Sequence, residues 1–98
     1  MRIYEYPLPA GAAEVTLMLP CPAAIMDVCV HSRTGTIYIR ARVLKERNGD
    51  DPRHFRIIPS GADFDDTMCI YIGSVEYATE WVTEWVHVYE TMGARDDR

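Results

Sequence analysis

Basic residues in the middle of the chain could bind an anion, because guanidinium groups form paired hydrogen bonds with phosphates and carboxylates. Arg40 and Arg42 lie in the run TIYIRARVL, and His54 and Arg56 lie in RHFRII. Tyr38, near the start of the first run, could stack on a nucleotide base. The alternative is a solvated surface on which Asp or Glu from a neighbouring strand balances the positive charges. The pattern therefore indicates either an anion-binding site or an ordinary charged face.

These five side chains share one surface only if the two runs are neighbouring strands. Both runs alternate apolar and polar residues, and the Asn48-Gly49 pair between them is typical of a hairpin connection. Keeping Ala41 and Phe55 on the same buried face fixes the register, because a slip of one residue would reverse every side chain. The opposite face of the predicted hairpin then carries the basic residues together with Tyr38.

The aromatic-rich run WVTEWVHVYE, residues 81–90, is a second candidate surface. As a strand, it turns its valines to one face and three larger rings to the other: Trp85, His87 and Tyr89. The valine face suits the core, so the aromatic face either packs against a second layer or binds a partner, including a second copy of the chain. Tyr71 and Tyr77 of the preceding run would extend the aromatic face.

Residues typical of catalysis or metal binding are scattered. The sequence contains no GxSxG, P-loop, GxGxxG or HExxH motif. His31, His54 and His87 could converge on zinc from three strands, and Cys29 could pair with His31 as nucleophile and base, but half-exposed imidazoles and a buried thiol are the better explanation. The acidic loop of Asp63, Asp65 and Asp66 lacks the glycine and glutamate of a calcium loop. We therefore expect a protein that is not an enzyme and has neither metal nor cofactor.

Strand-like runs supply the elements that would position these residues. They alternate with a period of two and are separated by turn residues such as Gly35. The run 24–32 places Met26, Val28 and Val30 on one face. Only residues 77–88, with Tyr77, Trp81, Trp85 and Val88, would also suit a helix. The pattern predicts an all-β chain, a single compact antiparallel β-sandwich or small barrel of about seven strands over residues 1–90, with a polar tail at 91–98.

Composition narrows the classes of function. The chain has 98 residues and a net charge of −5, which fits one domain and argues against a general nucleic-acid binder. No run is long and apolar enough to predict a signal peptide or a membrane helix. Cys21, Cys29 and Cys69 are odd in number and widely spaced, which favours free thiols in a reducing compartment. These features predict a cytoplasmic location.

Five short motifs, spread over residues 2–90, resemble a family of small phage-encoded proteins of unassigned function. They are IYEYPL, LPCPAAIMDV, FRIIPSG, YIGSV and WVHVYE. The chain departs from the family pattern at PSG, at Ser74 in place of a threonine, and in the longer segment ATEWVTE. The resemblance implies a compact β fold and an accessory phage product, and it assigns no catalytic residues.

Taken together, these features predict a non-enzymatic counter-defence protein in the cytoplasm of the infected host cell. It would bind a host immune protein or sequester an anionic nucleotide signal, with Arg40, Arg42, His54, Arg56, Tyr38, Trp85 and Tyr89 as candidate contacts. The alternatives are a minor virion or assembly protein and a small metal-dependent enzyme. Open sheet edges and exposed aromatic rings would favour a homo-oligomer in each case.

Overall fold

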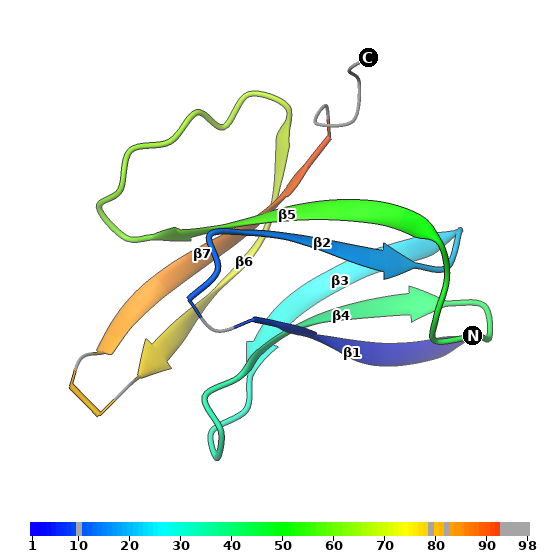
Figure 1. Cartoon of the computed structure of the whole chain (residues 1–98), viewed down its shortest axis with the longest axis horizontal. Helices are drawn as coiled ribbons and strands as arrows, with labels where there is room; N and C mark the ends of the chain where they lie inside the picture. Colours follow the sequence, from blue (N-terminus) through cyan, green and yellow to red (C-terminus); the bar gives the residue numbers. More distant parts are fainter. Residues whose placement is uncertain (10, 79, 82, 93–98) are drawn as a thin grey trace.

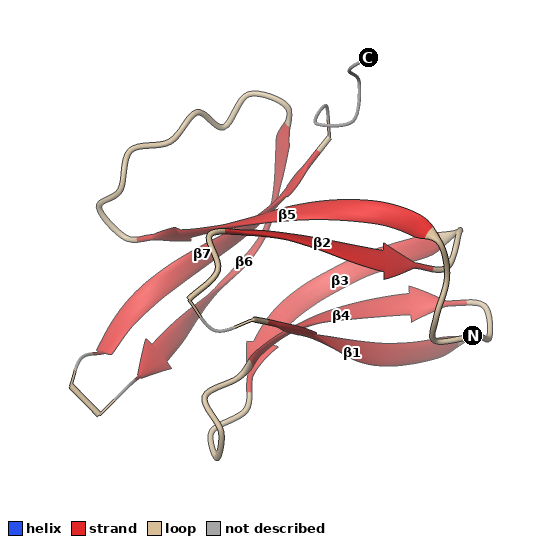
Figure 2. Ribbon diagram, in the orientation of Figure 1, coloured by secondary structure: helices blue, strands red, loops and turns tan. Residues whose placement is uncertain are grey.

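Seven β-strands build the molecule, and the computed structural model describes them over residues 1–9, 11–78, 80–81 and 83–92. None of the described residues is helical (Figure 2). The strands are β1 Arg2–Leu8, β2 Glu14–Leu19, β3 Ala23–Val30, β4 Ile37–Val43, β5 Asp51–Pro59, β6 Cys69–Ala78 and β7 Thr83–Thr91.

The strands form two sheets that face each other (Figure 1). Sheet A has the order β1-β4-β3, sheet B has the order β2-β5-β7-β6, and all hydrogen-bonded neighbours are antiparallel. The prediction of an all-β antiparallel sandwich is confirmed, and the barrel alternative is not what forms. The helical alternative for residues 77–88 is wrong, because β6 continues to Ala78 and β7 begins at Thr83.

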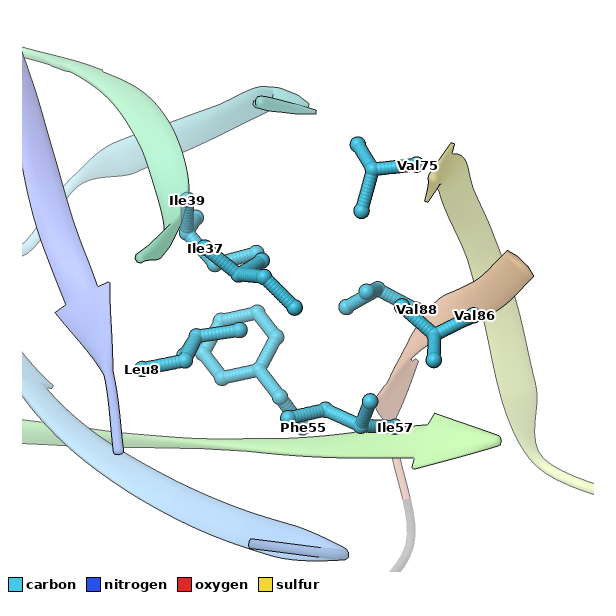
Figure 3. Packing of buried hydrophobic residues seen from close by; sticks show 8 residues of the cluster. All are labelled: Leu8, Ile37, Ile39, Phe55, Ile57, Val75, Val86 and Val88. Atoms are coloured by element: carbon cyan, nitrogen blue, oxygen red, sulfur yellow. The ribbon is translucent and has the colours of Figure 1, made fainter. Parts of the chain in front are cut away.

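The core lies between the two sheets. In Figure 3, Ile37 and Ile39 of β4 point across the core toward Phe55 of β5 and Val88 of β7. Alternate residues of each strand supply this layer, as the period of two requires. The expectation that Val86 and Val88 face the core is confirmed, since both are buried, whereas Val82 lies outside the described residues.

The predicted hairpin of β4 and β5 does not form. β4 is the central strand of sheet A and β5 belongs to sheet B, so the loop at 44–50 crosses from one sheet to the other. Alternation fixes only which face of each strand is buried. Two strands that face each other across the core bury their apolar sides just as well as two strands that are hydrogen-bonded neighbours in one sheet. Gly49 is needed for close approach instead, because a Cβ there would lie 2.4 Å from the Leu19 carbonyl oxygen and from Pro20.

A β-bulge in β3 changes which side chains share a face, and a second bulge lies between Tyr71 and Gly73 in β6. The register shifts between Ile25 and Asp27 in β3, so Ile25 packs toward the core while Met26 is exposed. The prediction that Met26 shares a face with Val28 and Val30 is therefore wrong. Periodicity alone cannot locate such a residue, because a bulge inserts one unpaired position and reverses the alternation beyond it.

One end of the sandwich is closed by polar groups that link the sheets. The Arg53 guanidinium forms two hydrogen bonds with the Glu90 carboxylate and a third with the carbonyl oxygen of Ala23 in sheet A. Nearby, the Tyr6 hydroxyl donates to the Arg47 carbonyl oxygen at 2.7 Å. We call this region, around Tyr6, Arg47, Arg53 and Glu90, the closed end.

The terminal segment is described only in part. β7 continues to Thr91, and of the predicted polar tail residues 93–98 lie outside the described part of the chain. Within the described residues, no helix of a length and apolarity suited to crossing a membrane is found.

Candidate functional site

The residues of the predicted anion-binding site are divided between the two outer faces of the sandwich. Tyr38, Arg40 and Arg42 lie on β4 in sheet A, whereas His54 and Arg56 lie on β5 in sheet B. All five alternate with buried residues and therefore point away from the core. Since the inner faces of the sheets meet, the outer faces look in opposite directions, and the five residues do not form one site. This correction follows directly from the failure of the hairpin prediction.

On sheet A, acidic neighbours balance the charge of Arg40. Arg40 is paired with Glu5 of β1 on one side and Asp27 of β3 on the other. Its Nε and Nη2 atoms donate to the Asp27 carboxylate at 2.6 and 2.5 Å. These bonds lower the pKa of Asp27 and raise that of Arg40. For Arg40, the alternative of a charge-balanced surface is therefore the correct one.

The Cys29 and His31 side chains share an outer face with Glu5, but the arrangement does not activate the thiol. His31 Nε2 lies 3.0 Å from one Glu5 carboxylate oxygen, and Cys29 Sγ lies 4.0 Å from the other. Burial, and then the negative charge of Glu5, raises the pKa of Cys29. A nucleophilic cysteine needs the opposite shift.

The three histidines do not converge. His31 is on the side of sheet A, whereas His54 and His87 belong to sheet B, where His54 contacts Thr16 at 2.9 Å. In the acidic loop, the Asp65 carboxylate accepts hydrogen bonds from the backbone and hydroxyl of Thr67. Across the residues that the structure describes, no group of three potential ligands could hold a metal ion.

The outer face of sheet B, in contrast, gathers aromatic side chains around an arginine. The ring centroids of Phe64 and Tyr89 are 4.9 Å apart, and those of Tyr71 and Tyr89 are 5.3 Å apart in an edge-on arrangement. Arg56 lies over the Phe64 ring at 5.8 Å. Trp85 follows on β7, on the same face as Tyr89, and is 49% exposed. We call these five residues the aromatic face.

A chain of hydrogen bonds borders the aromatic face and fixes its strands. Tyr71 hydroxyl contacts Ser74 Oγ at 2.5 Å, and Ser74 Oγ contacts His87 Nδ1 at 2.6 Å. His87 Nε2 contacts Ser60 Oγ at 2.8 Å, which ties the 60–68 loop to the sheet. Because both ring nitrogens of His87 are engaged, the imidazole has a fixed orientation.

The sequence predicted only part of the aromatic face. Tyr71 extends the face as expected, but the prediction for Tyr77 is wrong, because Tyr77 packs toward the core. The register shift between Tyr71 and Gly73 separates the two tyrosines onto different faces. Phe64 was missed, since a single aromatic residue in the acidic loop ADFDDT carries no periodic signal.

Arg56 carries an unsatisfied polar atom. Its Nη1 donates to the Asp65 carbonyl oxygen at 3.4 Å, whereas its Nε is buried and has no hydrogen-bond partner among the described residues. Beside it, Glu14, Thr16, His54 and Thr91 line a shallow depression. A buried donor without a partner costs about 1–3 kcal/mol. Arg56 is thus a cation held at the edge of an aromatic surface.

Comparisons with known proteins give one match. A search of curated proteins and a search of solved structures each found no match. One family profile matches residues 1–97, nearly the whole chain. The chain therefore belongs to the family described as Domain of unknown function (DUF7352).

Proposed function

We propose that this chain is a phage-encoded, non-enzymatic accessory protein that counters host defence by binding a host immune protein through the aromatic face. The five sequence motifs that resemble phage-encoded proteins support the phage origin. The observation that carries the binding role is that Tyr71, Tyr89 and Trp85 lie on one outer face, the face that also carries Arg56.

The composition of the aromatic face favours a protein partner. Tyr, Trp and Arg are the residues that most often dominate the binding energy of protein interfaces. Tyr89 is held between Phe64 and Tyr71, so its ring loses little freedom on binding. Trp85 and Tyr71 are 49% and 55% exposed, which leaves apolar area for a partner to cover.

A nucleotide ligand is less well supported. It was expected to contact basic residues of both β4 and β5, and these now lie on opposite sides of the molecule. Arg40 is already paired with Asp27.

The three cysteines form no disulfide, which fits the proposed location in the reducing cytoplasm of the infected cell.

Affinity purification of the tagged chain from infected cells tests the proposal. We expect one host protein to copurify at a fixed stoichiometry, and we expect Trp85→Ala with Tyr71→Ala to lose it. A hot-spot aromatic residue contributes about 2 kcal/mol, equivalent to about 30-fold in affinity. The matched control is Ile3→Ala, which removes an apolar side chain of similar exposure from the outer face of sheet A.

Three results would contradict this function. One is recovery of no host protein above background, and another is undiminished recovery with the double variant. The third is the presence of the chain inside purified virions, which would support the assembly role instead. Native mass spectrometry of the purified chain reports whether the aromatic face pairs two copies.

A further inference from the structure

A cavity of about 340 Å³ lies between the two sheets, at the end of the sandwich away from the Arg53–Glu90 pair. Its floor is the last layer of the core, formed by Leu8, Ile37, Ile57 and Val86. Its rim comes from the β1–β2 connection, the β3–β4 turn and the ends of β6 and β7. In Figure 1 the β3–β4 turn and the adjoining ends of β6 and β7 lie at the lower left of the molecule. We call this region the open end.

The open end is hollow because the segments around it carry small side chains. Gly11, Ala12 and Ala13 line the cavity from the β1–β2 connection, and Gly35 lines it from the β3–β4 turn. None of them can reach into the space above the core. Protein interiors are close-packed and contain few voids larger than a water molecule. A hollow of this size, comparable to small-molecule pockets of about 300–1,000 Å³, therefore needs an explanation.

A carboxylate belongs to the inner surface of this end. Glu84 alternates with Val86 and Val88 on β7, so it stands on the core side of the strand and lines the cavity. Its cross-strand neighbour is Tyr77, which also lines the cavity. No lysine, arginine or histidine is among the lining residues, and none of the described residues forms an ion pair with Glu84.

Glu90, on the same face of the same strand, shows what Glu84 lacks. Glu90 is buried, and the Arg53 guanidinium neutralises it through two hydrogen bonds. Glu84 has the same orientation relative to the sheet, but it is exposed to solvent and forms no ion pair with the described residues. A carboxylate beside an apolar surface is stabilised by a cationic partner. A cation attached to an apolar body would match both the carboxylate and the apolar lining of the open end.

We propose that the open end binds a small amine with an apolar body. The ammonium group lies beside the Glu84 carboxylate and the Tyr77 side chain. The apolar body covers Leu8, Ile37, Ile57 and Val86 and fills the space left by the small residues of the rim. This site is separate from the aromatic face, which lies on the outer surface of sheet B.

Three probes of similar size and different charge test the proposal in NMR titrations. They are 2-phenylethylamine, the neutral 2-phenylethanol and the anionic 3-phenylpropionate. We expect a Kd of about 1 mM for the amine, as is usual for fragments of this size. Because its charge-assisted hydrogen bond is absent from the alcohol, we expect the alcohol to bind about tenfold more weakly and the anion more weakly still. The methyl signals of Ile37, Ile57 and Val86 should shift.

Glu84→Gln isolates the contribution of the carboxylate. We expect it to weaken the amine about tenfold, to the level of the alcohol, and to leave the affinity of the alcohol unchanged. The matched control is Glu76→Gln, which makes the same change of charge on the outer face of the neighbouring strand, opposite Trp85. It should leave the affinities of all three probes unchanged.

Ala12→Leu tests the cavity itself, and we expect it to remove binding of the amine and of the alcohol. If this variant does not fold, the methyl shifts of the wild type still locate the site. The proposal is overturned by failure of all three probes to bind, by equal affinity for amine and anion, by shifts that map away from the open end, or by equal effects of Glu84→Gln and Glu76→Gln.

Discussion

The two ends of the sandwich place a glutamate of β7 in opposite environments. At the closed end, Glu90 is buried, and Arg53 both neutralises it and reaches the backbone of sheet A. At the open end, Glu84 lies above a cavity and has no cation beside it among the described residues. The fold therefore uses one charged pair to join its sheets and leaves the other carboxylate available. This difference separates a stabilising region from a candidate binding region.

The largest effect should follow from breaking the pair at the closed end. Arg53→Ala leaves Glu90 unpaired, with side-chain exposures of 21% for Arg53 and 10% for Glu90. We expect the free energy of unfolding to fall by about 3 kcal/mol, measured by urea denaturation. The double variant Arg53→Met with Glu90→Leu should lose less, because it removes both charges.

Glu84→Gln is the counterpart at the open end, and it should change the free energy of unfolding by less than about 0.5 kcal/mol. If Arg53→Ala lowers the free energy of unfolding no more than Glu84→Gln does, the two ends contribute equally to stability, which would contradict the distinction between them.

Glycines at the two ends should respond differently to an added methyl group. Gly49→Ala near the closed end places a Cβ against backbone atoms of Leu19 and Pro20 that cannot move independently, so we expect a loss of about 2 kcal/mol. Gly11→Ala at the open end meets no atom within 4 Å and suffers only from its φ of +76°, at a cost of about 1 kcal/mol. Thermal and urea denaturation of both variants measure the order, and the reverse order would refute it.

The smallest effect concerns pH at the closed end. Burial raises the pKa of Tyr6 above its ordinary value of 10.0. The protonated phenol is favoured in the folded state. Its contribution to the free energy of unfolding is therefore complete below pH 10.0 and is lost as the pH rises through the higher pKa of the folded state. We expect the stability difference between wild type and Tyr6→Phe to shrink above pH 10.0 in urea denaturation. A difference that stays constant would contradict this.

The alternation of apolar and polar residues predicted which side chains share a face of one strand better than it predicted which strands are neighbours. The valine side of β7 and the outward direction of Trp85 and Tyr89 follow from alternation alone, and both are observed. The joint site of Arg40 and Arg56 required a choice of strand partner, which alternation does not encode. Long-range pairing depends on how whole sheets pack, and the Asn48-Gly49 signal was a misleading guide to it.

Bulges explain most of the remaining errors at single residues. One in β3 brings Asp27 opposite Arg40 and exposes Met26. The other, in β6, places Tyr71 on the outer face while Tyr77 packs inward. In the sequence, Gly73 was the available signal of the bulge in β6, because a glycine inside a strand often marks a bulge or a close approach of the backbone. In the structure, a Cβ at this position would lie 2.9 Å from a methyl carbon of Val28.

The sequence by itself determined the class of fold and, in the strands without a bulge, the side that is buried, because the period of two forces alternate residues to opposite faces. Only the tertiary structure decided which strands share a sheet, and with it the division of the basic residues, the pairing of Arg53 with Glu90 and the cavity below Glu84. These depend on contacts between residues far apart in the chain, which the packing of two sheets settles and local periodicity does not.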